Sequence, residues 1–175
     1  SVLRPPQQGA PQGYMGAMDA TGGRIVVVAR PRPHGGIRAY FSILGDQEGI
    51  QRLEVIDLSK KGVKEFIAAS LSSEEFPVVE APGGYCVHLL HEAAVLTQRL
   101  GRPLPKGYSD VERGLRDVTW DGPDPLIYHY ISEETVKDKP RLLKESGTLH
   151  RITPFSSWFL NPEDLVQYAE AIREA

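Results

Sequence analysis

Basic side chains cluster around a glycine pair at the turn between two predicted strands. The glycines are Gly35 and Gly36, and the basic cluster consists of Arg30, Arg32, His34 and Arg38. A planar guanidinium binds phosphate and carboxylate groups through paired hydrogen bonds, and the backbone N–H groups of a glycine turn add further donors. The cluster therefore predicts an anion-binding site at the hairpin tip. The alternative is a solvated hairpin whose arginines protect its edges and pair with surface acids.

Aromatic residues follow the basic cluster, which extends the prediction to nucleic acid. Tyr40 and Phe41 could stack on bases beside the arginines. Residues 24–38 contain four arginines and no acidic residue, although the whole chain has a formal net charge of −3. With that overall charge the molecule does not resemble a general polyanion binder. Nucleic-acid binding would therefore be local to this segment, and it is not the favoured interpretation.

A second candidate for anion binding lies at the junction between the third predicted strand and a predicted helix. The residues there are Ser59, Lys60, Lys61, Gly62 and Val63. Backbone N–H groups at a helix start bind phosphates readily, and two lysines would add charge. Lys60, Lys61 and Gly62 are therefore candidate phosphate-binding residues. The alternative is that both lysines belong to the first turn of an ordinary amphipathic helix.

The order of predicted elements around this junction resembles the acetyl-coenzyme A core of the GNAT acetyltransferases. In residues 24–100, three strands precede the basic glycine turn, and a helix, a strand and a second helix follow it. The resemblance implies an acetyl-coenzyme A-dependent transferase whose glycine-containing loop, here 59–63, holds the pyrophosphate of the coenzyme. Lys64 stands where that loop carries Gly or Ala. No catalytic residue follows from the resemblance.

Histidines and the single cysteine gather near the start of another predicted helix. His88 and His91 are three positions apart, so a helix brings them close together, and Glu92 lies one turn from His88. A metal site needs three or four converging ligands, and no other His or Cys stands at a recognisable spacing. Cys86 is expected to be a buried, unreactive thiol. The sequence thus predicts no catalytic residue, no metal site and no cofactor other than the coenzyme implied above.

The elements that would position these residues predict an α+β fold. Short apolar runs rich in β-branched residues, bounded by Gly and Pro, predict an antiparallel three-stranded meander at 24–30, 37–44 and 50–58. A fourth strand is expected at 76–81, and it could join the sheet parallel to the third strand through a right-handed crossover. Apolar positions three and four apart predict helices over 60–71 and 85–100, packed against the sheet. A capping box, Ser109 with Glu112, predicts a short helix to about Val118.

The two ends of the chain differ from this core. Residues 1–23 are rich in Gly, Pro and Gln, which is typical of a flexible linker or arm. The core is expected over 24–118. Residues 119–175 read as small helices that pack on the core or form a subdomain. Because the chain begins at Ser1 and stops within a predicted helix at Ala175, we expect a domain cut from a longer protein.

Composition and the absence of a catalytic motif limit the classes of function that the sequence predicts. The chain has one cysteine and no apolar run near the roughly 20 residues that span a bilayer, so we expect a cytoplasmic protein without a membrane partner. The linker-like start and the lack of an assembled catalytic motif favour a non-catalytic interaction module. Its partner would be another domain or protein, bound at a sheet face or beside the C-terminal helices. The alternatives are the anion or nucleic-acid binder and the acetyl-coenzyme A-type transferase.

Overall fold

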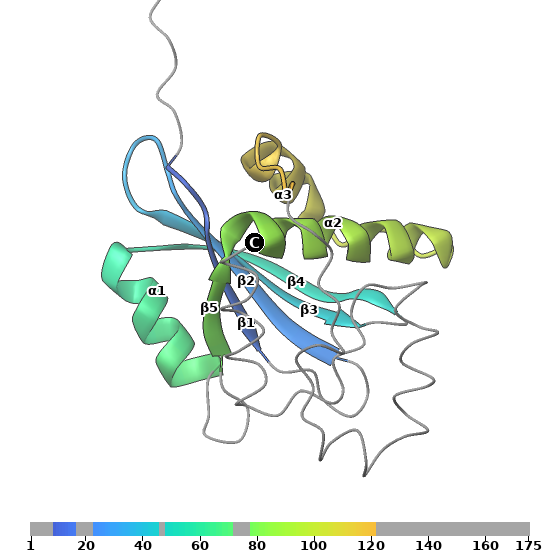
Figure 1. Cartoon of the computed structure of the whole chain (residues 1–175), viewed down its shortest axis with the longest axis horizontal. Helices are drawn as coiled ribbons and strands as arrows, with labels where there is room; N and C mark the ends of the chain where they lie inside the picture. Colours follow the sequence, from blue (N-terminus) through green and yellow to red (C-terminus); the bar gives the residue numbers. More distant parts are fainter. Residues whose placement is uncertain (1–8, 17–22, 46–47, 72–77, 122–175) are drawn as a thin grey trace, which may run out of the picture.

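The computed structural model describes residues 9–16, 23–45, 48–71 and 78–121, and these form an α+β fold (Figure 1). The elements in chain order are β1 (Gln12–Gly16), β2 (Gly23–Pro31), β3 (Ile37–Gly45), β4 (Gly49–Leu58), α1 (Lys60–Phe66), the π-helical turn η1 (Ile67–Leu71), β5 (Val78–Pro82), α2 (Gly83–Arg99) and α3 (Tyr108–Leu115). The predicted antiparallel meander is confirmed as β2, β3 and β4. The helices predicted for the last third of the chain, 122–175, lie outside the described residues.

One sheet of five strands holds the fold together. Its strand order is β4-β3-β2-β1-β5, and every neighbouring pair is antiparallel. The hairpin between β2 and β3 turns at Gly35 and Gly36, which both have positive φ values (106° and 74°) that other residues rarely adopt. A β-bulge between Ile43 and Leu44 shifts the register of β3 against β4.

Strand β1 lies within the segment whose composition predicts a flexible linker or arm, and the structure corrects that prediction for residues 12–16. These residues pair with β2 on one side and with β5 on the other. Tyr14 and Met15 are buried in the two cores. Gly13 is needed for close packing, because a Cβ there would lie 2.5 Å from Cys86 Sγ and 2.7 Å from the Ala81 carbonyl oxygen. The glycine marks a close approach of main chains, which composition alone does not separate from flexibility.

The predicted fourth strand is confirmed as β5, but it occupies a different place from the one considered above. It pairs antiparallel with β1, at the edge of the sheet opposite β4. The parallel crossover with β4 is therefore not formed. The physical reason is that β1, which pairs with β2 on one side, leaves its other edge for β5.

Two apolar cores cover the two faces of the sheet, since side chains alternate along each strand. Helices α2 and α3 pack on one face, as Figure 1 shows for α2. The buried side chains there include Met15, Val26, Val28, Tyr40, Tyr85, Leu89, Leu90, Val111 and Leu115. The other face packs against α1 and η1 and buries Tyr14, Val27, Ala29, Phe41, Val63 and Ile67.

Helix ends follow the predicted local signals, with one exception. Ser59 caps α1, and its Oγ accepts a hydrogen bond from the Gly62 amide at 3.1 Å. Gly101 closes α2 with a φ of +73°. The predicted capping box at Ser109 is wrong, because the N-cap of α3 is Gly107, two residues earlier, and Ser109 Oγ donates to the Lys106 carbonyl oxygen. Among the described helices, none is long and apolar enough to cross a membrane.

Candidate functional site

The basic segment 24–38 is not a continuous basic surface in the structure. Arg24 and Arg30 are buried, with 2% and 5% of their surface exposed. Arg30 forms a bidentate ion pair with Asp117, with both N–O distances at 2.6 Å. Its guanidinium also donates to the carbonyl oxygens of Gly9 (2.8 Å) and Gly114 (2.9 Å). Arg30 therefore ties β2 to residues on either side of it in the chain, and few of its donors remain for a ligand.

Arg32 and Arg38 share a single carboxylate on β4. Arg38 donates to both oxygens of Asp57, at 2.8 and 3.2 Å, and Arg32 donates to one of them at 3.2 Å. The hydrogen bond from Arg38 is the main cause that lowers the pKa of Asp57 below its usual value. The same bond raises the pKa of Arg38. His34 is exposed in the turn beyond these pairs and does not line the pocket that they border.

Three of the four predicted anion-binding residues do border one pocket, which has a volume of about 190 Å³. Its lining consists of Arg30, Pro31, Arg32, Pro33, Arg38, Tyr40 and Gly114. A guanidinium has five N–H groups. Arg38 uses two of its N–H groups on Asp57 and Arg32 uses one, so both retain donors that could face an anion. With Asp57 and Asp117 as counter-ions, the three arginines leave one net positive charge at this pocket.

The residues of the predicted phosphate-binding turn, Lys60, Lys61 and Gly62, form the first turn of α1, which Ser59 caps. The Gly62 amide already donates to Ser59, to its Oγ at 3.1 Å and to its carbonyl oxygen at 3.0 Å. Lys60 and Lys61 are exposed and form no ion pair with any described residue. Acetyl-coenzyme A binding at this turn stays a prediction.

The histidines and the cysteine lie on α2, where His91 is half-buried and Cys86 is buried. Within the described ranges, no three His, Cys, Asp or Glu side chains converge as metal ligands would. Burial, together with the charge of His88, lowers the pKa of His91. Cys86 is fully buried, and that burial raises its thiol pKa to about 12. A thiol with so high a pKa is a poor nucleophile, which fits the predicted unreactive cysteine.

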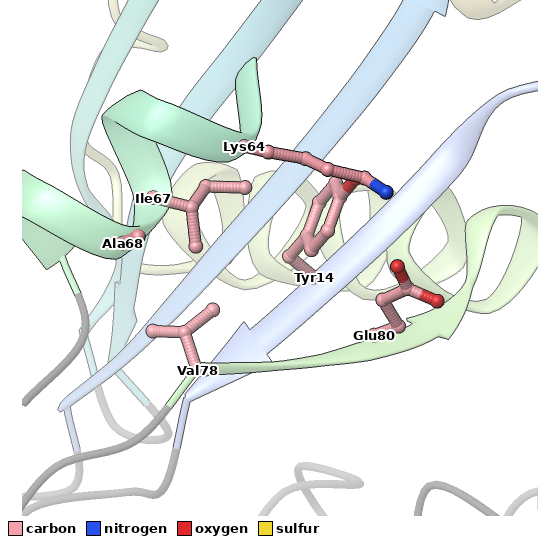
Figure 2. Close-up of a pocket in the computed structure, with 6 residues that line it drawn as sticks. All are labelled: Tyr14, Lys64, Ile67, Ala68, Val78 and Glu80. Atoms are coloured by element: carbon pink, nitrogen blue, oxygen red, sulfur yellow. The ribbon is translucent and has the colours of Figure 1, made fainter. Parts of the chain in front are cut away.

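A larger pocket lies on the other face of the sheet, between α1–η1 and strands β1 and β5 (Figure 2). Its volume is about 290 Å³, and its lining consists of Tyr14, Lys64, Ile67, Ala68, Val78 and Glu80. Sequence reasoning missed this site because Tyr14 falls in the segment that composition predicts to be a flexible arm. The alternation of Tyr14 and Met15 between two glycines was the available signal of a short strand.

The pocket combines an apolar floor with charges of both signs. Ile67, Ala68 and Val78 supply the apolar surface. Figure 2 shows Lys64 extending over the Tyr14 ring, with its amine and the Glu80 carboxylate both near the hydroxyl end of that ring. Lys64 forms no hydrogen bond or ion pair with any described residue. The ammonium group of Lys64 is therefore available to an acidic group on a ligand.

The hydroxyl group of Tyr14 is the polar centre of this pocket. It donates a hydrogen bond to Gln12 Oε1 at 3.3 Å. Burial, followed by the negative charge of Glu80, raises the pKa of Tyr14 above its usual value. The phenol therefore keeps its proton at neutral pH and acts as a neutral hydrogen-bonding group. Together these residues can bind an apolar group that carries a polar or acidic neighbour.

Comparison with known proteins gives no match for this chain. No family model matches it, and neither does any curated protein or any solved structure.

Proposed function

We propose that this chain is a non-catalytic interaction module that binds another domain or protein through the pocket between α1–η1 and strands β1 and β5. The observation that supports the proposal is the combination of an apolar floor with a lysine at its rim, Lys64, that forms no ion pair with any described residue. Protein interfaces centre on such pockets, where one partner inserts an apolar side chain and polar groups around it set the orientation.

The chemistry of the pocket defines the partner that would fit. Ile67, Ala68 and Val78 favour an aliphatic or aromatic side chain, and a volume of about 290 Å³ accommodates one such group. Lys64 favours an acidic residue beside it. We therefore expect a segment of the partner that presents an apolar residue next to Asp or Glu, since opposite charges at an interface guide association and select the partner.

Two variants and one control test this proposal. Ala68→Arg places a long side chain at the mouth of the pocket, and Lys64→Glu reverses the charge at its rim. Lys106→Glu is the matched control, because Lys106 is exposed in the loop before α3 and does not line the pocket. Immobilised wild-type protein and the three variants are exposed to the same native lysate, and the retained proteins are compared by mass spectrometry.

We expect a set of proteins that the wild type and Lys106→Glu retain and that both pocket variants lose. Circular dichroism should give the same spectrum for all four proteins, since the substituted side chains are exposed. Retention of the same proteins by Ala68→Arg as by the wild type would contradict the proposal.

The arginine pocket supports a second candidate function, the binding of a small anion. Three guanidinium groups border one pocket of about 190 Å³, and those of Arg32 and Arg38 retain N–H donors. Calorimetric titration with inorganic phosphate tests this function. Heat of binding at low salt should disappear in Arg32→Ala and persist in Arg113→Ala, whose arginine is exposed on α3. An oligonucleotide that binds here would show affinity falling steeply with salt, and no binding of either probe would exclude the site.

A further inference from the structure

Among the described strands, β4 lies at one edge of the sheet and has a neighbouring strand on one side only. It spans ten residues and pairs only with β3 in the sheet. Apart from the β3 ladder, one backbone hydrogen bond reaches β4 from the described residues, in which the Ile50 amide donates to Thr97 Oγ1 at 2.9 Å. Within the described part of the chain, nothing pairs with the outer N–H and C=O groups of residues 51–58, so these groups could pair with another strand. Edges of this length are usually protected or used in assembly.

Charged side chains of opposite sign occupy the middle of this edge. Arg52 and Glu54 lie on the α1 face of the sheet, with 58% and 45% of their surface exposed, and their side chains pair at 2.6 Å. The Arg52 guanidinium also lies 5.8 Å from the centre of the Phe41 ring, which fixes it on that face. Leu53, between them, points to the other face and packs against the α2 core. Two copies of this edge can therefore offer each other complementary charges.

Symmetry limits how two such edges can meet. A two-fold axis perpendicular to the sheet makes the strands antiparallel, and it keeps paired residues on the same face. The central pair must then be one residue facing its own symmetry mate. An axis at Arg52 or at Glu54 places like charges opposite each other, which is destabilising. An axis at Leu53 places Arg52 of each copy opposite Glu54 of the other.

We propose that two copies of this chain associate through the outer edges of β4, antiparallel, with Leu53 at the two-fold axis. Residues 51–55 of each copy form the new ladder, because Ile50 is already bonded to Thr97. Two Arg52–Glu54 pairs then cross the interface on the α1 face, and the two Leu53 side chains meet on the α2 face. The two five-stranded sheets become one continuous sheet.

Charge exchange at these two positions provides a sharp test. Arg52→Glu alone places Glu opposite Glu in both cross-strand pairs, and Glu54→Arg alone places Arg opposite Arg. We expect each single variant to weaken the dimer about tenfold, since two attractive pairs become repulsive. The double variant R52E/E54R restores opposite charges and should dimerise like the wild type. Sedimentation velocity across about 1 μM to about 1 mM protein measures the dissociation constants.

Mixing the two single variants separates this interface from any other. In the mixture, both residues are acidic in one copy and basic in the other, so a heterodimer should form more tightly than either homodimer. Arg113→Glu removes an exposed ion pair on α3 and serves as the control that leaves dimerisation unchanged. The proposal is overturned if the wild type remains monomeric at about 1 mM. It is equally overturned if the single variants dimerise like the wild type or if their mixture forms no heterodimer.

Discussion

Arg30 and Asp117 join strand β2 to the segment that follows α3. The guanidinium is 5% exposed, whereas the carboxylate is 69% exposed, and two hydrogen bonds of 2.6 Å connect them. A buried guanidinium needs a counter-ion, because an unpaired charge away from water is strongly destabilising. Arg30 therefore contributes to the fold by holding the end of α3 against the sheet.

The first prediction concerns this ion pair. Asp117→Asn leaves the buried guanidinium without its counter-ion, and we expect the free energy of unfolding to fall by about 1 to 3 kcal/mol. Urea denaturation followed by circular dichroism measures the change. Asp110→Asn, which breaks an exposed pair with Arg113, is the control and should stay within about 0.5 kcal/mol of the wild type. Equal losses in the two variants would show that Arg30 does not depend on Asp117.

The second prediction is the pH dependence of the same interaction. The hydrogen bond from Arg30 lowers the pKa of Asp117 in the folded protein, relative to about 3.9 in an unfolded chain. The stabilisation is therefore fully present above that unfolded value and is lost as the pH falls through the lower, folded pKa. The difference in unfolding free energy between wild type and Asp117→Asn should be constant from pH 7 to about pH 5 and shrink below about pH 4. Urea midpoints at these pH values check it, and a difference that grows with acid would contradict it.

At the scale of elements, β1 connects β5 to the rest of the sheet. It is the strand between β2 and β5, so the five-stranded sheet exists only when residues 12–16 are in place. Its first glycine, Gly13, has no side chain and therefore lets Cys86, near the start of α2, pack closely against β1. Its last glycine, Gly16, has room for a methyl group, since the nearest atom to a Cβ there would be 3.6 Å away.

The third prediction uses these two glycines as a matched pair on one strand. Gly13→Ala forces a methyl group against Cys86 and the Ala81 carbonyl, and we expect a loss of about 1 to 3 kcal/mol in unfolding free energy. Gly16→Ala should be tolerated. Thermal and urea unfolding of both variants measure the difference. If Gly13→Ala were as stable as Gly16→Ala, residues 12–16 would not pack as the structure has them.

At the scale of the whole molecule, the two proposed surfaces lie at opposite edges of the sheet. The pocket for a partner involves β1 and β5, and the proposed dimer forms through β4, as Figure 1 shows by the placement of these strands. The strands β3 and β2 separate the two surfaces. A dimer would therefore carry its two pockets on the same face of the continuous sheet, at the two outer ends, where it could bind two partner segments at once.

The fourth prediction is that the two surfaces act independently. Lys64→Glu should leave the dimer dissociation constant unchanged in sedimentation velocity, because Lys64 lies beside β5 and away from β4. Arg52→Glu should leave the set of captured proteins unchanged in the lysate experiment. A variant at one surface that abolished both properties would indicate a single shared interface.

The sequence alone was sufficient for the features that depend on neighbouring residues. The strands β2, β3 and β4 follow from apolar runs bounded by glycine turns, and the caps at Ser59 and Gly101 follow from single residue types. These features depend on residues only a few positions apart, so the local residue types are enough to specify them. The cluster of basic residues is also a local feature of the sequence, and three of its four members border one pocket, while anion binding there stays a prediction.

Only the tertiary structure decided which distant residues meet. Arg30 forms an ion pair with Asp117, which lies 87 positions further along the chain. Strand β5 pairs with β1, and Tyr14 and Lys64 line the same pocket. These long-range contacts depend on how all the side chains of the two cores pack together and on which strand edges are left for pairing. No local pattern encodes that sum, which is why the sequence predicts Arg30 as an anion-binding residue but does not predict its ion pair with Asp117.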